Sequence, residues 1–127
     1  MSEMNKFGIT HQDQDGIDCL YLNGYLDAHT APELENEISN LVEKGKHKIL
    51  VNFRDLDYIS SAGLGVFMAF IEDVREHGGD IKLTEMKPKV FSVFDLLGFP
   101  ILFDIEAEEK EALVKFNSND KASDEKE

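Results

Sequence analysis

Short apolar runs alternate with acidic and glycine-containing segments along the chain. Residues 7–12 and 17–23 have strand patterns, and Asp15–Gly16 between them is typical of a hairpin turn. The second run is apolar on both faces, which predicts a strand inside the sheet that ends at Gly24. Residues 48–53 predict a third strand, whose continuous apolar centre indicates that both faces are covered.

Helical periodicity follows the second and third strands. Thr30-Ala31-Pro32-Glu33 has the pattern of a capping box with proline in the first turn, and predicts a helix that ends near Gly45. A second helix is predicted to begin at Ser60–Ser61 and to stop at Gly78–Gly79. Its inward stripe is expected to contain Leu64, Phe67, Met68, Ile71 and Val74. Val66 and Phe70 lie off this stripe and are expected to pack against a neighbouring loop, or to form an interaction face.

The last third of the chain adds two strands and two helices to the prediction. Strands are expected over residues 80–85 and 101–105, with a helix from Pro88 to Gly98 and a short helix over residues 106–116. Residues 117–127 contain no apolar residue larger than alanine, so a disordered acidic tail is expected. The fold class is therefore α/β, with a mixed sheet of four to five strands and about four helices.

Composition narrows the class of partner. A chain of 127 residues with 42% hydrophobic residues fits one domain, and its net charge of −13 opposes binding to nucleic acid or to anionic membranes. A basic protein surface is the natural complement. The chain has neither an apolar run of about 20 residues nor a signal-peptide pattern, which predicts a cytoplasmic location and no membrane contact. The single cysteine, Cys19, is expected to be a buried structural residue.

The stretch from Val51 to Gly65 is the most plausible place for chemistry. It is predicted to run from a buried strand, through a short acidic connection, into two serines and two glycines at a helix start. Backbone N–H groups at a helix N-terminus lack intrahelical acceptors, so a phosphate on either serine would be tolerated there. Gly63 and Gly65 would let a partner backbone or a ligand approach closely.

Other chemistries find less support in the sequence. The four histidines show no metal-ligand spacing, and Gly65 is not followed by the lysine of a phosphate-binding loop. The serines lack the preceding glycine of a nucleophile elbow. His29 with Asp27 could supply the general base of a hydrolase, but their spacing is not specific for one. Simple helix capping is the plainer role for both serines.

Two separated segments are similar to the STAS domain of bacterial anti-sigma-factor antagonists. They are residues 24–31, Gly-Tyr-Leu-Asp-Ala-His-Thr-Ala, and residues 57–66, Asp-Tyr-Ile-Ser-Ser-Ala-Gly-Leu-Gly-Val. The resemblance extends from about Phe7 to Phe116 and implies a single STAS-like domain over residues 1–116, followed by the tail of residues 117–127.

The resemblance also implies a switch. In that family an unphosphorylated antagonist binds a serine kinase that is also an anti-sigma factor, so the sigma factor is released. Phosphorylation of one serine breaks the complex, and a PP2C-type phosphatase restores it. The position that matches the phosphorylated serine is Ser61, with Ser60 as second choice. The implied partner-binding residues are Asp27, His29, Thr30, Tyr58, Ser60, Ala62, Gly63, Leu64, Gly65 and Val66.

The chain departs from the family at the position before the switch. Well-known members have aspartate there, whereas this chain has Ser60, which removes a charge and adds a second possible acceptor. Ala62 stands where a serine or threonine is usual. No cofactor or metal is implied, and the free protein is expected to be a monomer or weak dimer. Two alternatives stay open: an unphosphorylated STAS module that binds another regulator or a nucleotide, and a less favoured serine hydrolase.

Overall fold

A five-stranded mixed sheet in the order β1-β2-β3-β4-β5 forms the centre of the protein. The structure, a computed structural model, describes residues 7–125, with side chains described for residues 7–117. Strand β1 (Gly8–Gln14) pairs antiparallel with β2 (Ile17–Leu26). Strands β3 (Lys48–Ile59), β4 (Asp80–Thr84) and β5 (Asp104–Glu106) then add in parallel. The predicted α/β class with a mixed sheet is confirmed.

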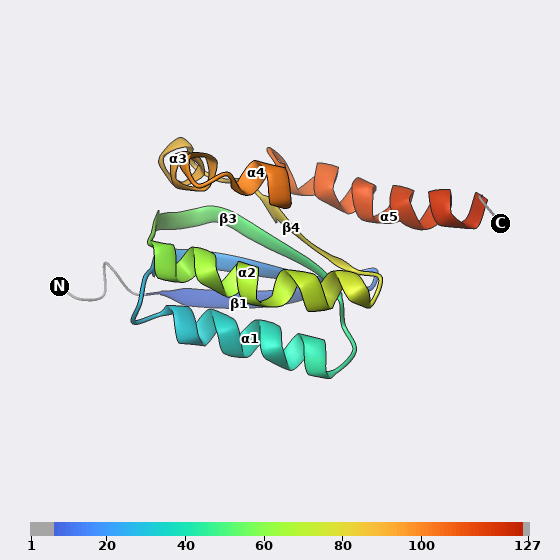
Figure 1. Cartoon of the computed structure of the whole chain (residues 1–127), viewed down its shortest axis with the longest axis horizontal. Helices are drawn as coiled ribbons and strands as arrows, with labels where there is room; N and C mark the ends of the chain where they lie inside the picture. The colour runs from blue at the N-terminus through green and yellow to red at the C-terminus, as the bar shows by residue number, and fades with distance from the viewer. Residues whose placement is uncertain (1–6, 126–127) are drawn as a thin grey trace.

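Helices cover the two faces of the sheet unequally. Helices α1 (Ala31–Glu43) and α2 (Ser61–Glu76) lie side by side on one face (Figure 1). Helices α3 (Pro88–Leu96) and α4 (Phe99–Leu102) extend the same hydrophobic core. Helix α5 (Glu109–Glu125) covers a smaller core on the other face, made of Ile17, Cys19, Leu50, Ala112 and Phe116. Alternate residues of the central strands therefore supply two separate cores.

Cys19 is buried, as predicted, and it belongs to the smaller core. Its side chain is fully buried between β2 and α5. Burial raises the pKa of the thiol to about 11, because the charged thiolate is poorly solvated there. The thiol is therefore protonated at neutral pH and its role is to fill space.

Strands β2 and β3 are both longer than predicted. Gly24 does not end β2, because its positive φ of 87° fits a register irregularity and lets the strand continue to Leu26. The residues predicted as a short acidic connection after Phe53 are strand as well, since Asp55 pairs with Asn23 and Tyr58 pairs with Tyr25. The consequence is that β3 leads directly into α2, with Ser60 between them.

The predicted strand over residues 101–105 is wrong in its first half. Gly98 adopts a left-handed conformation with φ of 79°, and Pro100 fits the first turn of the short helix α4. Ile101 is therefore helical and 89% exposed, and only Asp104–Glu106 pair with β4. The left-handed conformation of Gly98 ends α3, and Pro100 two residues later favours the start of another helix, α4, over a strand.

The final helix also differs from the prediction. It begins at Glu109 because residues 104–106 are taken by β5, and it continues past Phe116 to Glu125. The division into a domain of residues 1–116 and a disordered tail of 117–127 stays a prediction. Residues 126–127 lie outside the described part of the chain.

Candidate functional site

The pairing of β2 with β3 brings the two STAS-like sequence segments together. Tyr25 lies opposite Tyr58, with ring centroids 5.5 Å apart, and Leu26 lies opposite Ile59. The backbone N–H of Ser60 then donates to the Leu26 carbonyl at 2.9 Å. Residues 24–31 and 57–66 thus meet at the carboxyl end of two parallel strands, a common place for functional sites in α/β sheets.

The loop from Asp27 to Thr30 is held by its own side chains. One Asp27 carboxylate oxygen accepts from the backbone N–H of His29 at 2.9 Å and of Thr30 at 3.2 Å. The Thr30 hydroxyl accepts from the Asp27 N–H and donates to the Tyr25 carbonyl, both at 2.9 Å. The predicted capping box is wrong, because Thr30 makes no side-chain cap on α1. The hydroxyl instead fixes the entry to the loop.

Ser60 and Ser61 have opposite surroundings. Ser60 occupies the N-cap position of α2 with extended backbone, and its carbonyl accepts from the Gly63 and Leu64 N–H groups. Its hydroxyl makes no capping bond and is a buried hydroxyl without a partner among the described residues. Ser61 is the first residue of α2 and is exposed. Only the second hydroxyl is therefore open to an enzyme.

The two glycines of α2 serve different purposes. Gly63 is buried, and a Cβ there would lie 2.8 Å from Leu26 Cγ and 3.0 Å from Ile59 Cγ1. The close approach expected at Gly63 is made by the protein's own strands. At Gly65 a Cβ would meet nothing within 4 Å. It faces a hollow of about 270 Å³ lined by Ala28, Ala31, Pro32, Glu35, Ala62, Gly65, Val66 and Ala69.

The implied partner-binding residues fall into a surface layer and a supporting layer. Exposed positions are His29, Tyr58, Ala62 and Gly65, and half-buried positions are Asp27, Thr30 and Ser60. Gly63, Leu64 and Val66 are buried. Val66, one of the two off-stripe residues, is buried in the large core and also lines the hollow at Gly65. Direct partner contacts are thus available to the exposed and half-buried residues.

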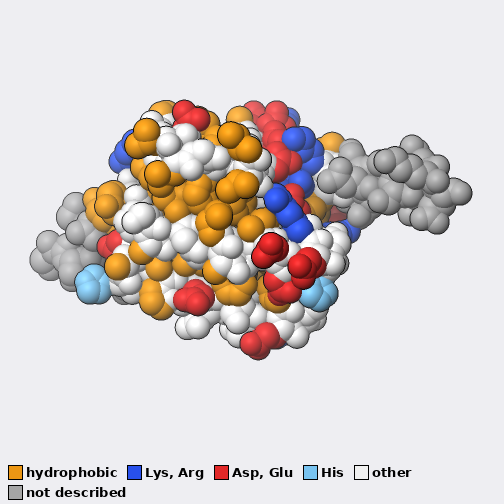
Figure 2. All heavy atoms as spheres, in the orientation of Figure 1, with side chains coloured by type: hydrophobic (Ala, Val, Ile, Leu, Met, Phe, Trp, Pro, Cys, Tyr) orange, Lys and Arg blue, Asp and Glu red, His pale blue; other side chains and the backbone are white. Residues whose placement is uncertain are grey.

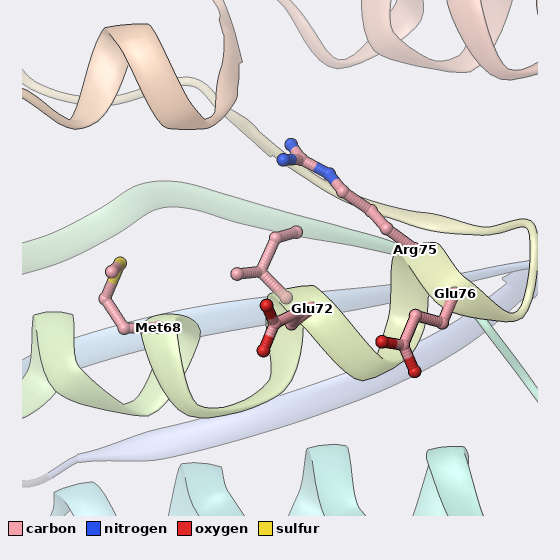
Figure 3. Close-up of a pocket in the computed structure, with 5 residues that line it drawn as sticks. Met68, Glu72, Arg75 and Glu76 are labelled. Atoms are coloured by element: carbon pink, nitrogen blue, oxygen red, sulfur yellow. The ribbon is translucent and has the colours of Figure 1, made fainter.

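Met68 was expected in the core, and this prediction is wrong. It is 46% exposed, because Ser61, Gly65, Met68 and Glu72 form one outward stripe at helical spacing. Met68 and Arg75 line a hollow of about 510 Å³ together with Ile71, Glu72 and Glu76. Figure 3 shows the Met68 and Arg75 side chains extending from α2. The stripe joins the phosphorylation candidate to a groove two turns further along α2.

An ion pair beside the site was missed in the sequence. Asp57, near the end of β3, accepts a short hydrogen bond from the Lys87 ammonium at the N-cap of α3. This bond and the charge of Lys87 lower the pKa of the exposed Asp57 carboxyl. Nothing in the sequence spacing of 30 residues signals the contact. It fixes α3 next to the strand end from which α2 begins.

Residues 9–112 match the STAS domain family. The chain belongs to this family. The STAS domain is 33% identical over 110 residues to BtrV of Bordetella bronchiseptica, a candidate anti-sigma factor antagonist, and this covers 87% of the chain and 95% of BtrV. It is 32% identical over 84 residues to the anti-sigma-B factor antagonist of Bacillus subtilis, covering 66% and 76% of the two chains.

Solved structures show the same fold. Unphosphorylated SpoIIAA, an anti-sigma factor antagonist, superposes with a TM-score of 0.75 at 24% identity, covering 89% of this STAS domain chain and 97% of SpoIIAA. The phosphorylated form of Bacillus SpoIIAA gives a TM-score of 0.66 at 23% identity, covering 87% and 98% of the two chains. At these identities the likeness concerns the fold.

The described residues of the STAS domain contain no group of three His, Cys, Asp or Glu side chains placed to hold a metal ion. Within the same part of the chain, every helix is too short or too polar to cross a membrane.

Proposed function

We propose that this STAS domain is a cytoplasmic anti-sigma factor antagonist that is switched off by phosphorylation of Ser61. In this proposal the unmodified protein binds an anti-sigma factor that is also a serine kinase, and a PP2C-type phosphatase reverses the modification. The names of BtrV and of the Bacillus subtilis relative support the antagonist role. The existence of a phosphorylated form of the fold neighbour SpoIIAA supports the switch.

The contrast between the two serines is the observation on which the proposal rests. A kinase must bring a serine hydroxyl in line with a nucleotide phosphate, which requires an accessible oxygen. Ser61 is exposed at the first position of α2, whereas the Ser60 hydroxyl is buried beneath the β3–α2 junction. This favours Ser61 over Ser60 as the acceptor.

The surroundings of Ser61 fit a switch that acts on binding and leaves the fold intact. A phosphate adds about −1.5 to −2 charges at pH 7, and the helix N-terminus stabilises negative charge. Ser61 precedes Ala62 and lies one helical turn before Gly65, and both of these residues line the hollow between α1 and α2. A partner side chain that enters this hollow would then meet added bulk and charge.

The test is recovery of the partner by variants of the tagged, full-length protein expressed in its own cells. We expect wild type and Ser61→Ala to retain a protein with a serine-kinase domain, and Ser61→Glu to lose it at least tenfold. Asn40→Glu is the matched control, because it adds the same charge at an exposed position of α1. Equal recovery by Ser61→Glu and Asn40→Glu would contradict the switch.

A second candidate is binding without phosphorylation, which the open hollow at Gly65 favours because it exists in the unmodified protein. Gly65→Leu would place a bulky side chain in this hollow, from a position where an added Cβ meets nothing within 4 Å. If Gly65→Leu loses the partner while Ser61→Glu retains it, the protein is a constitutive binding module.

A further inference from the structure

Helices α3 and α4 present a large exposed apolar face. Ile101 is 89% exposed and Leu96 is 84% exposed, and both are large aliphatic residues. Figure 2 shows hydrophobic side chains gathered over α3, α4 and the adjoining edge of α2. We call this surface the α3–α4 face and define it by Phe91, Leu96, Leu97, Ile101 and Leu102.

The α3–α4 face differs in charge from the rest of the chain. Residues 88–102 contain one basic side chain, Lys89, and one acidic side chain, Asp95, in a protein with a net charge of −13. The segment is therefore neutral, while Glu72 and Glu76 lie beyond it on α2. A contiguous apolar surface of this kind on a soluble domain usually marks a protein contact.

We propose that the α3–α4 face is covered by a second copy of this chain, so that the protein forms a two-fold symmetric dimer. In such an interface every contact occurs twice, because residue i of one copy contacts residue j of the other and residue j of the first contacts residue i of the second. Lys89 and Asp95 are both exposed on α3, at equal distances in sequence from the exposed Ser92. Two α3 helices crossing antiparallel at Ser92 would place each Lys89 beside the Asp95 of the second copy.

The size of the surface also fits a second copy. From their exposed fractions, the five defining residues present on the order of 600 Å², against about 800 Å² per partner in a standard interface. The exposed polar residues of α3, Lys89, Ser92 and Asp95, supply the remaining rim. The proposal does not depend on phosphorylation, because it uses no residue of the Ser61 surface.

Electrostatics gives the dimer a recognisable salt dependence. Two chains of charge −13 repel each other at long range, whereas the contact itself is apolar and neutral. Salt screens the repulsion, so self-association should strengthen as ionic strength rises. A basic partner protein on the same face would show the opposite dependence.

The test is sedimentation equilibrium of the purified full-length protein between about 1 and 500 μM, at low and high sodium chloride. We expect a mass that rises from 14.4 kDa toward twice that value, with a several-fold lower dissociation constant at high salt. Leu96→Lys and Ile101→Lys should weaken the dimer at least tenfold. Both positions are highly exposed, so the variants should keep the wild-type unfolding temperature.

Two controls identify the surface and its symmetry. Val114→Lys changes an apolar residue of α5 that is 59% exposed, and it should leave the dimer unchanged. Lys89→Asp should weaken the dimer, and the double variant Lys89→Asp with Asp95→Lys should restore it. A protein that stays monomeric at every concentration and salt level, or a dimer that Leu96→Lys does not weaken, would overturn the proposal. Neither result would bear on the Ser61 switch.

Discussion

Two adjacent serine hydroxyls at the start of α2 differ in what they contact. The Ser60 hydroxyl is buried without a partner among the described residues, so it gives α2 no capping bond. Loss of an N-cap hydroxyl ordinarily costs about 1 kcal/mol. We expect Ser60→Ala to change the free energy of unfolding by less than about 0.5 kcal/mol, or to raise it, because an unsatisfied polar group is removed. Urea unfolding at pH 7 measures this difference.

A decrease of about 1 kcal/mol or more in the free energy of unfolding of Ser60→Ala would contradict this prediction, because it would mean that the hydroxyl caps α2 in solution. Ser61→Ala is the control, since it removes an exposed hydroxyl one residue later.

Gly63 and Gly65 provide a matched pair within one helix. A methyl group at Gly63 would press on Leu26 and Ile59, so Gly63→Ala should destabilise the protein by about 1–3 kcal/mol. At Gly65 the space is open, and Gly65→Ala should stabilise the helix by up to about 1 kcal/mol. Urea unfolding of both variants tests whether Gly63 is closely packed and Gly65 faces open space. Similar values of the same sign for both would refute it.

At the scale of elements, one carboxylate at the start of α5 accepts hydrogen bonds from three strands of the sheet. Glu109, its first residue, accepts from Gln14 at 3.0 Å and Tyr21 at 3.0 Å with one oxygen, and from Asn52 at 2.9 Å with the other. Burial raises the pKa of Glu109, but these hydrogen bonds outweigh it and the pKa is lowered. The ionised carboxylate is thus the form that holds α5 in place.

The lowered pKa predicts how stability depends on pH. Glu109 contributes stability above its ordinary pKa of 4.5, and this contribution is lost as pH falls through its lower folded-state value. Glu109→Gln should therefore cost about 1–3 kcal/mol at pH 7, and the difference from wild type should shrink below about pH 4.5. Urea unfolding across this pH range measures it, with Glu108→Gln as an exposed control. A pH-independent difference would contradict the role of the charge.

The order of elements was predictable from the sequence except for α4, and several boundaries were not. Apolar periodicity located α1, α2 and α3, because each must bury one face. Gly24 was predicted to end β2, but the strand continues past it because Tyr25 and Leu26 still pair with β3. The sequence alone does not distinguish a glycine within a strand from one at its end. Two features of the site depend on tertiary packing, which local sequence patterns do not reveal. They are the contact between Asp57 and Lys87 and the burial of the Ser60 hydroxyl beside an exposed Ser61. The candidate site was located because both of its segments resemble one family.

At the scale of the whole molecule, the Ser61 surface and the α5 core lie on different parts of the sheet. Ser61 begins the helix on the large-core face, whereas α5 covers the opposite face. Phosphorylation should therefore leave folding cooperative, and the unfolding temperature should change by only a few degrees. Calorimetry of a homogeneous Ser61 phosphoform tests this. Loss of a cooperative transition would show that phosphate acts by unfolding the domain.

The central claim is that cells phosphorylate Ser61. Phosphopeptide mass spectrometry of the protein isolated from its own cells, beside a Ser61→Ala strain, tests it most directly. We predict phosphate on the peptide that contains Ser61, located at Ser61 by fragmentation and absent from the Ser61→Ala protein. Phosphate on Ser60, or two unmodified serines under every growth condition, would contradict the account.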